Sequence, residues 1–509
     1  GKNKNGYSRI KNIRVYEIAL TSAEILNNFM SNEKDKAAQI ALVNFQKGDE
    51  LPTVTVYCDF SGLGKDDKKY CDIIYNSPDP SKYGESFALM GKHSQLQYQG
   101  TSSMQYPIKN YRLNPKNADG KVAIKLPFCQ PETRFTLKAD FMSSGHWQNT
   151  GLTKWINNNL YNYDENDEKS MNPAKWWAIQ NGKDPGDYRE CIYGFPCRLI
   201  LVNDGTSELN EGQQEPTPGN TKDMGVFNFN LDKDCQNSLG FTIADFPNAI
   251  SMEVTANSDT SAGAFMSRND LSDEEQLKYL KESFELRYPD EDDVSSSWGF
   301  LGMEIEDENG EKTFDRSYGL ASLIDWVDNS SDEEFVSEFE EHFHKDYTLR
   351  YYLLVIILGM VDNLGKNMML DSYDGKIWMP RFYDCDTICS YDNSGAIKFD
   401  VDIEMEQGYW NTSSSRLWTR IRDLFHDELI AKYNNMRQNG LSYESFMSVF
   451  YDEQIAKIPQ KYYNLDADVK YIPYADEYLG KAHGDGYEHL KRWLKSRLIF
   501  TDTLFDYTP

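Results

Sequence analysis

The spacing of apolar residues changes along this chain, and this change restricts the class of fold more than any other feature. Up to about residue 265, apolar and polar residues alternate in short runs, such as those that start at Thr53 and at Leu96. Alternation with a period of two is typical of strands in a half-exposed sheet. Beyond about residue 270 the period becomes helical, as in Leu349–Val361. The sequence therefore predicts an α+β protein, with an antiparallel sheet lobe over about 53–265 and a helical lobe over about 266–509.

Size and charge narrow the class of protein further. The chain has 509 residues, 39% of them apolar, which is enough for a sizeable core. Its formal net charge of -28 argues against a nucleic-acid binder, because affinity for phosphate backbones comes mainly from Lys and Arg. The longest apolar stretch, Tyr351–Val361, is too short to cross a bilayer. We therefore expect no nucleic-acid partner and no membrane span.

The N-terminal segment has the pattern of a strand followed by a short helix. Residues 6–29 run GYSRIKNIRVYEIALTSAEILNNF, in which Thr21 and Glu24 have the spacing of a capping box. This segment resembles the end of laminin-G/concanavalin-like lectin domains. The resemblance implies that residues 1–30 are the C-terminal remnant of a lectin-like jelly roll, that residues 31–52 are a linker, and that any carbohydrate binding belongs to the missing upstream domain. An ordinary strand–helix edge is the alternative.

A glycine-rich turn between two predicted strands is the first candidate for chemistry. The segment LQYQGTSSMQYPIKNYRL leads from a strand into Gly100, Thr101, Ser102 and Ser103, and then into a strand that carries Lys109 and Arg112. Glycine lets backbone N–H groups approach a phosphate closely, and small hydroxyl residues add donors without bulk. A basic residue on the return strand can neutralise the phosphate. An ordinary turn between strands remains the alternative.

The second candidate follows the predicted buried helix. The segment VDNLGKN contains Asp362 and Asn367, and one hairpin later an apolar strand ends in Asp384-Cys385-Asp386. Phosphoryl transfer needs a carboxylate that orients the attacking hydroxyl and oxygen ligands that hold Mg²⁺ on the nucleotide phosphates. In kinases an Asp-x4-Asn loop and a later Asp supply these groups in this order. The alternative is an Asn/Asp turn with an acidic hairpin end, such as a calcium site.

Several segments together resemble one known family. QGTSSMQYPIKNYRL resembles the "RGNSSxxxPKKSYRLK" phrase of the CotH (spore-coat protein H) family, and VDNLGKNMMLDSYDGKIWMPRFYDCD resembles its "VDNHxxNYxLYxxxxGKWxxIPWDxD". FTLKADFMSSGHWQNTGLTKWI resembles the segment that leads from a strand into a helix, and YEHLKRWLKSRLIFTDTLF resembles the closing helix. The matches keep their order across roughly residues 50–505. The resemblance implies an atypical protein-kinase-like bilobal fold over 53–509 and an ATP-dependent kinase that phosphorylates coat proteins.

The resemblance also implies roles for the candidate residues. Asp362 would be the catalytic aspartate, Asn367 and Asp384 would be metal ligands, and Asp386 would be a further or substitute ligand. The loop from Gly100 to Ser103 would cover the phosphates and Lys109 would contact them, with Arg112 as its replacement.

The sequence also departs from the family pattern. The family's "RG" is Gln99-Gly100 here, and the first of its paired lysines is Ile108. Both changes reduce the positive charge near the phosphates.

Two hypotheses of function follow. The first is an ATP- and Mg²⁺-dependent protein kinase that acts on Ser or Thr of a coat, surface or virion protein. The second is a catalytically silent kinase-fold module of a phage virion, in a tail or appendage, or of a secreted bacterial surface protein. The four polar residues of the second candidate favour the enzyme, whereas Gln99 and Ile108 favour the silent module. Both hypotheses favour a virion or an extracellular, cell-surface location over the cytoplasm.

Overall fold

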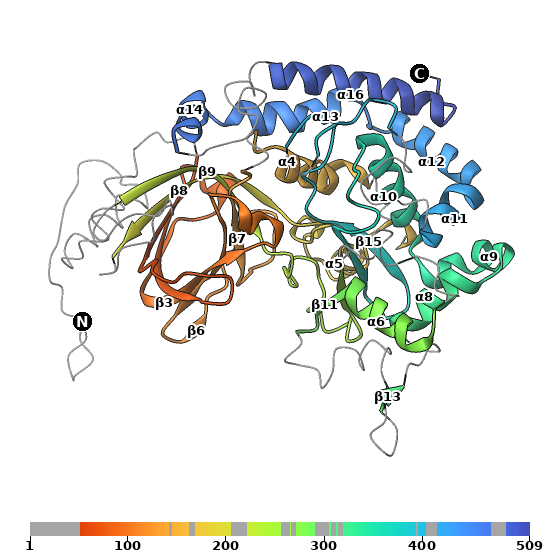
Figure 1. Cartoon of the computed structure of the whole chain (residues 1–509), viewed down its shortest axis with the longest axis horizontal. Coiled ribbons are helices and arrows are strands. Elements are labelled where there is room, and N and C mark those ends of the chain that lie inside the picture. The colour runs from red at the N-terminus through yellow and green to blue at the C-terminus, as the bar shows by residue number, and fades with distance from the viewer. Residues whose placement is uncertain are drawn as a thin grey trace.

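A barrel of strands and a larger helical part lie side by side in the computed structural model of the chain (Figure 1). The structure describes residues 51–141, 145–161, 168–204, 221–255, 265, 271–290, 305–306, 312–313, 319–392, 395–403, 415–469 and 485–508. Residues 1–50 lie outside the described residues, so the lectin-like remnant over 1–30 and most of the linker over 31–52 stay predictions.

The first part is a closed seven-stranded barrel with the order β1-β2-β3-β4-β7-β9-β8. Its strands are β1 (Thr53–Cys58), β2 (Lys69–Asn76), β3 (Phe87–Gln99), β4 (Asn110–Asn114), β7 (Phe135–Lys138), β8 (Gly194–Asn203) and β9 (Thr221–Leu231). The predicted sheet lobe is therefore more closed than expected, because β1 pairs with β8 in parallel and leaves no free edge. The other neighbouring pairs are antiparallel, as predicted.

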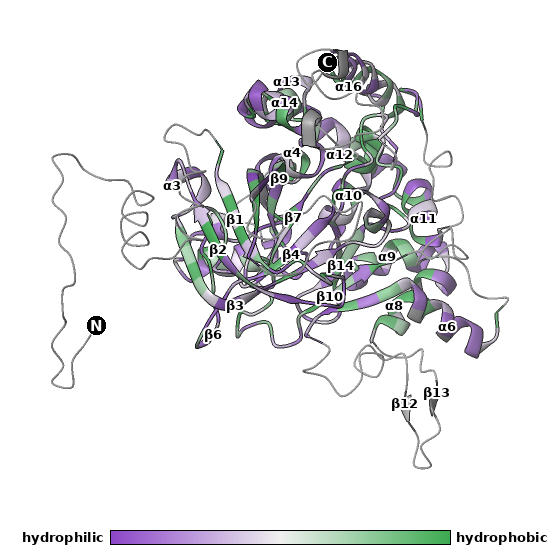
Figure 2. Ribbon diagram, turned by 60° about the vertical axis from the view of Figure 1, so that its left-hand side comes forward, coloured by the Kyte–Doolittle hydropathy of each residue, from purple (hydrophilic) through white to green (hydrophobic). Residues whose placement is uncertain are grey.

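Alternation along the strands gives the barrel an apolar interior and a polar outer wall, visible as alternating colours on the strands in Figure 2. One row of opposed residues, Tyr98, Tyr111, Leu137 and Phe229, points inward and is buried. The neighbouring positions on the same four strands are polar and share the opposite face. These polar residues are Gln97, Gln99, Asn110, Arg112, Thr136, Lys138, Asn228 and Asn230. We call this face the polar wall.

The helical part is built around a second sheet that the helical period did not predict. Its order is β11-β10-β14-β15, with β10 (Ile250–Val254), β11 (Phe284–Tyr288), β14 (Met368–Ser372) and β15 (Trp378–Phe382). The sheet takes β10 from before residue 266 and the other three strands from after it. Two short hairpins, β5 (Lys116–Asn117) with β6 (Gly120–Lys121) and β12 (Ile305–Glu306) with β13 (Lys312–Thr313), complete the strands.

Most helices lie in the second half, as the helical period predicts. They are α6 (Asp273–Ser283), α8 (Gly319–Asn329), α9 (Asp332–His342), α10 (Lys345–Leu358), α11 (Arg416–Leu424), α12 (His426–Gln438), α13 (Tyr443–Met447), α14 (Gln460–Val469) and α16 (Asp485–Leu504). The first half adds α3 (Pro80–Tyr83), α4 (Gln148–Trp155) and α5 (Pro173–Gln180). None of the helices within the described residues is long and apolar enough to span a membrane.

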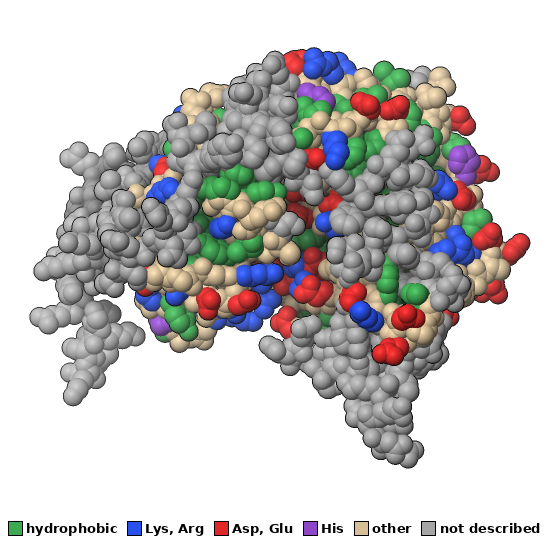
Figure 3. Space-filling model, in the orientation of Figure 1, with side chains coloured by type: hydrophobic (Ala, Val, Ile, Leu, Met, Phe, Trp, Pro, Cys, Tyr) green, Lys and Arg blue, Asp and Glu red, His purple; other side chains and the backbone are tan. Residues whose placement is uncertain are grey.

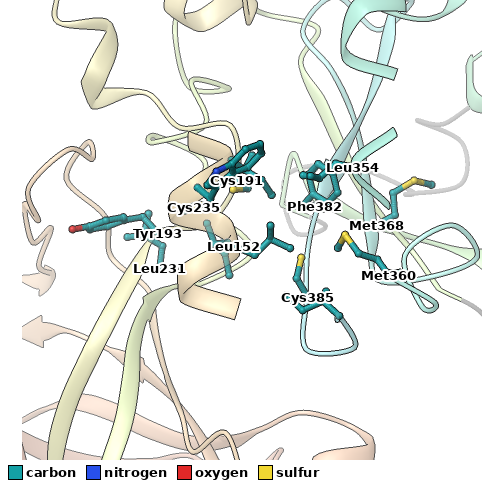
Figure 4. Close-up of a cluster of buried hydrophobic side chains, with 14 of the residues drawn as sticks. Leu152, Cys191, Tyr193, Leu231, Cys235, Leu354, Met360, Met368, Phe382 and Cys385 are labelled. Atoms are coloured by element: carbon teal, nitrogen blue, oxygen red, sulfur yellow. The ribbon is translucent and has the colours of Figure 1, made fainter. Parts of the chain in front are cut away.

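One hydrophobic core joins the barrel to the helical part. Figure 4 shows side chains of Leu231 from β9, Leu152 from α4, and Leu354 and Phe382 from α10 and β15 in a single cluster. All four side chains are almost completely buried. Because α4 lies between the barrel and β15, it can hold groups from both parts in register.

Helix α10 ends immediately before the first candidate carboxylate, and a buried arginine holds this end. Gly359 adopts a left-handed φ of 58° and terminates the helix. The Arg497 guanidinium from α16 donates to the carbonyl of Ile356 in the last turn of α10, and to the carbonyls of Val401 at 2.6 Å and Ile403 at 2.7 Å. With Arg497 only 1% exposed, these carbonyls lack access to water as an alternative donor.

We expect Arg497→Met to lower the free energy of unfolding by about 3 kcal/mol, because it removes four hydrogen bonds to the carbonyls of Ile356, Val401 and Ile403, three of them buried. Arg492→Met, on the exposed side of the same helix, should change it by less than about 0.5 kcal/mol. Urea denaturation followed by tryptophan fluorescence measures both. Equal losses in the two variants would show that these hydrogen bonds add nothing net to stability.

Candidate active site

The loop between α10 and β14 presents a buried aspartate. Asp362 is 3% exposed, and its Oδ2 accepts a hydrogen bond from Nδ2 of Asn367 at 2.9 Å. The ammonium of Lys366 lies 3.6 Å from the same oxygen. The other carboxylate oxygen, Oδ1, is buried and has no hydrogen-bond partner among the described residues. A buried carboxylate oxygen without a donor is costly, so it marks a place where a ligand would be favourable.

Asn363, which the sequence analysis did not single out, holds this loop against the end of β15. Its Nδ2 donates to the carbonyl of Asn367 at 2.8 Å and to the carbonyl of Tyr383 at 3.0 Å. Its own carbonyl accepts from the hydroxyl of Tyr351 in α10 at 2.5 Å. The Asp-x4-Asn loop and the Asp-Cys-Asp segment are therefore tied together by one side chain.

The two predicted metal ligands share an unusual backbone. Asn367 has a φ of 52° and Asp384 a φ of 48°, in the left-handed region that residues other than glycine rarely adopt. Such strain persists only where surrounding interactions impose it, and it clusters at functional sites. Here one of these interactions comes from α4, where Oδ1 of Asn149 accepts from the backbone N–H of Cys385 at 2.6 Å.

Crowding of carboxylates changes the acidity of the site. Burial raises the pKa of Asp362 to about 6; repulsion from Asp384 adds to this effect and Lys366 opposes it. Loss of hydration, together with Asp384 and Asp362, holds the pKa of Asp386 well above its ordinary value. The site therefore favours positive charge, either a proton or a metal cation.

On the barrel side, the glycine-rich turn follows β3 as predicted. Gly100 has a φ of 113°, and a Cβ atom there would collide with Oγ of Ser103. Ser102 begins the 3₁₀ turn η1 (Ser102–Gln105). Thr101 is exposed, and Nδ2 of Asn110 donates to Oγ of Ser103 at 3.2 Å, which fixes the turn on β4.

The two basic residues on the return strand have different surroundings. The Lys109 ammonium donates to the carbonyl of Met104 at 2.8 Å and to the carbonyl of Tyr106, so it holds the turn from behind. It is not among the residues that line the cleft described below. Arg112 does line that cleft, and its Nε donates to Oδ2 of Asp232 at 2.9 Å. The Lys109 ammonium thus binds the turn itself, and its predicted contact with nucleotide phosphates stays a prediction.

Asp232 directly follows β9 and forms an ion pair with Arg112 at 2.9 Å. Burial alone would raise the pKa of Asp232, but the attraction of Arg112 and Lys233 outweighs burial and holds the pKa below its ordinary value. Lys233 also binds Glu253 of β10, which Arg287 of β11 contacts at 2.8 Å. This network connects the polar wall to the second sheet.

Both candidate segments face one cleft of about 680 Å³ between the barrel and the helical part. Figure 3 shows acidic and basic side chains gathered in this hollow. Eight of the ten residues singled out from the sequence line it: Gly100, Thr101, Ser103, Arg112, Asp362, Asn367, Asp384 and Asp386. Asp362 follows Arg112 by 250 residues in the sequence, so the tertiary fold alone brings the two segments together.

The cleft also contains Asp140, which the sequence analysis did not identify. Its Oδ2 lies 3.3 Å from Nδ1 of His146 and accepts from Nδ2 of Asn228. Nε2 of His146 lies 2.7 Å from Oδ2 of Asp466 in α14, and this aspartate also accepts from the backbone N–H of Val226. Asp140 and His146 have left-handed φ angles, as Asn367 and Asp384 do. No local motif signals this chain of contacts, because its members come from three separate parts of the sequence.

The donors present fit a magnesium ion that is bound together with a nucleotide. Within the described residues, no three His, Cys, Asp or Glu side chains lie close enough to hold a metal alone. Mg²⁺ is commonly held by only one or two carboxylates, with substrate phosphates and water as the remaining ligands. Asp384 and the amide oxygen of Asn367 provide oxygen ligands of this kind, and Asp362 lines the same cleft.

The fold and the cleft define an α+β protein whose barrel and helical part enclose a site of opposed carboxylates and cations. The model of the family described as CotH kinase protein matches residues 260–500, so this part of the chain is similar to the CotH family. The match includes Asp362, Asn367, Asp384 and Asp386 and confirms the resemblance over this region. No match was found among curated proteins.

We expect Asp362→Asn to be more stable than the wild type at pH 7.5 without metal, by on the order of 2–3 kcal/mol. The native pKa of about 6 exceeds the unfolded value of 3.8, so the unfolded state ionises more easily and stability falls as pH rises through this range. At pH 4.5 the gain should shrink to about a third.

Chemical denaturation in EDTA at the two pH values measures this difference. Asp400→Asn, at an exposed position, is the matched control and should change stability little at either pH. A gain for Asp362→Asn that is the same at pH 4.5 and 7.5 would contradict the electrostatic cause.

Proposed function

We propose that this chain is an ATP- and Mg²⁺-dependent protein kinase of the CotH type that phosphorylates Ser or Thr of a coat, surface or virion protein. The observation that carries the proposal is the buried, unpartnered Oδ1 of Asp362 in the same cleft as Asn367 and Asp384. The family match supports it, since it covers these residues. In this proposal the bilobal arrangement of kinases corresponds to the barrel and the helical part.

Each residue has a role in the proposed transfer. Asp362 orients the acceptor hydroxyl and takes its proton as the oxygen attacks the terminal phosphorus. The bond from that phosphorus to the bridging oxygen breaks, and ADP leaves. Asn367 and Asp384 would hold Mg²⁺, which neutralises charge on the phosphates. Backbone N–H groups at the turn of Gly100 would contact the phosphates.

The neighbourhood of Asp362 suits this role. Lys366, at 3.6 Å, favours the ionised carboxylate that accepts a proton. Bound Mg²⁺ would act in the same direction through its positive charge. A pKa of about 6 lies near the operating range of a general base, so proton transfer from a hydroxyl would be more favourable than to an ordinary aspartate.

The silent module is the second candidate, and one observation favours it. Lys109 holds the turn and lies outside the cleft lining, and Gln99 and Ile108 supply no charge there. If no other cation binds the phosphates, nucleotide affinity would be lost and the chain would serve as a structural or adhesive component.

Thermal melting with and without Mg²⁺-ATP, together with a transfer assay, distinguishes the two candidates. We expect millimolar Mg²⁺-ATP to raise the melting temperature of the wild type by several degrees through mass action. Asp362→Asn should keep most of this shift, measured from its own melting temperature, but lose phosphoryl transfer to itself or to a generic protein acceptor. Asp384→Asn should lose most of the shift, because a metal ligand loses its charge.

Mass spectrometry of the wild type after incubation with Mg²⁺-ATP detects autophosphorylation directly. Mg²⁺ with AMP is the nucleotide control, since it lacks the phosphates that share the metal. No thermal shift and no transfer for the wild type would overturn the kinase and favour the silent module.

A further inference from the structure

Lys138 lies on the polar wall at the edge of the cleft. It is the last residue of β7 and stands opposite Asn228 of β9, whereas its neighbour Leu137 points into the barrel and is buried. Its side chain is half-buried and lines the cleft. The position places an ammonium group on the barrel side of the site, across from the carboxylates of the helical part.

Apart from Lys65, the other basic side chains that line the cleft lie beside carboxylates. Arg112 is bound to Asp232, Lys233 and Arg287 are bound to Glu253, and Lys366 lies beside Asp362. Lys65 lines the cleft from an exposed position. Within the described part of the chain Lys138 forms no salt bridge, although it is half-buried.

Lys138 lines the same cleft as Asp384 and Asp386, the acidic residues that follow β15. It is close enough to Asp386 for an electrostatic attraction between the two side chains. The ammonium therefore acts on the end of the cleft where the carboxylates gather. An ammonium near metal-binding carboxylates repels a bare cation but attracts a cation that arrives with bound phosphates.

We propose that Lys138 is the phosphate-binding cation of this cleft and contacts the terminal phosphates of a nucleoside triphosphate that arrives with its divalent cation. This inference rests on the proposed function and gives Lys138 the role that the sequence analysis assigned to Lys109. A lysine suits the role, because it is a compact point charge that contacts phosphate oxygens without a fixed geometry. Its position on a barrel strand fixes where its backbone lies relative to the cleft.

The test compares three ligands on Lys138→Met, a variant that keeps the length of the side chain and removes the charge. We expect the dissociation constant for ATP with Mg²⁺ to rise tenfold or more. The constant for AMP should change by less than threefold, because AMP lacks the terminal phosphates. Affinity for Mn²⁺ alone, followed by electron paramagnetic resonance, should stay unchanged or increase, because a repelling charge is lost.

This pattern separates phosphate binding from a structural role, since a distorted cleft would weaken all three ligands. Lys138→Arg keeps the charge and should retain ATP affinity within about threefold. Lys65→Met is the matched control for a lysine at the exposed rim, and should bind ATP as the wild type does. Melting temperatures of all variants without ligand establish that they are folded.

Three results would overturn the inference. Two of them leave the proposed function standing, and the third overturns both proposals. If the wild type binds ATP and Lys138→Met binds it within twofold of the same affinity, the role of Lys138 is wrong while the proposed function stands. The same holds if Lys138→Met weakens Mn²⁺, AMP and ATP equally. If the wild type binds neither Mn²⁺ nor ATP at millimolar concentration, both proposals fail together.

Discussion

The side-chain amide of Asn363 is the contact on which the arrangement of the site depends. It joins the backbone of Asn367, within the loop after α10, to the backbone of Tyr383, at the end of β15. Together with the pairing of Met368 in β14 and Phe382 in β15, these two hydrogen bonds keep Asp362 and Asp384 in one cleft although their charges repel. Buried amide–carbonyl hydrogen bonds can resist this repulsion, since breaking them would leave polar groups without partners.

The rest of the structure supports this contact from several directions. Arg497 holds the end of α10, Asn149 of α4 holds the backbone of Cys385, and Tyr351 donates to the carbonyl of Asn363. These groups come from three helices that are far apart in sequence, α16, α4 and α10. The common core in Figure 4 keeps the helices in register, and the left-handed backbone at Asn367 and Asp384 is the local consequence.

The electrostatic balance of the cleft explains why it is suited to a metal–phosphate ligand rather than to a bare ion. Carboxylates from the helical part and cations from the polar wall line the same cleft, which has a volume of about 680 Å³. A bare cation would be attracted by one wall and repelled by the other. A phosphate group with its metal presents both charges in the order that the two walls require. The salt bridges of Arg112 with Asp232 and of Lys233 with Glu253 neutralise part of the positive charge in the cleft, which limits repulsion between its cations.

Much of this protein follows from local patterns in the sequence. The change of hydrophobic period at about residue 270 separates the barrel strands from most helices, and the order and spacing of Asp362, Asn367 and Asp384 identify the acidic half of the site. These features depend on neighbouring residues, because strand alternation, helix period and a short loop are all local. The second sheet was predicted only in part. The sequence indicates the hairpin that ends before Asp384, whereas β10 and β11 escaped prediction, since they are short and separated by helices and loops.

Only the tertiary structure decided which side chains share the cleft. Lys109 is the lysine nearest the glycine-rich turn in sequence, yet its ammonium is bound by the carbonyls of Met104 and Tyr106. Lys138 is distant from any motif and reaches the cleft because closure of the barrel places β7 beside β4. Asp140 joins the site through contacts with His146 that no spacing encodes. Side-chain direction on a curved wall depends on strand pairing across the whole barrel, and this is why sequence alone determined the chemistry of the site but not its full membership.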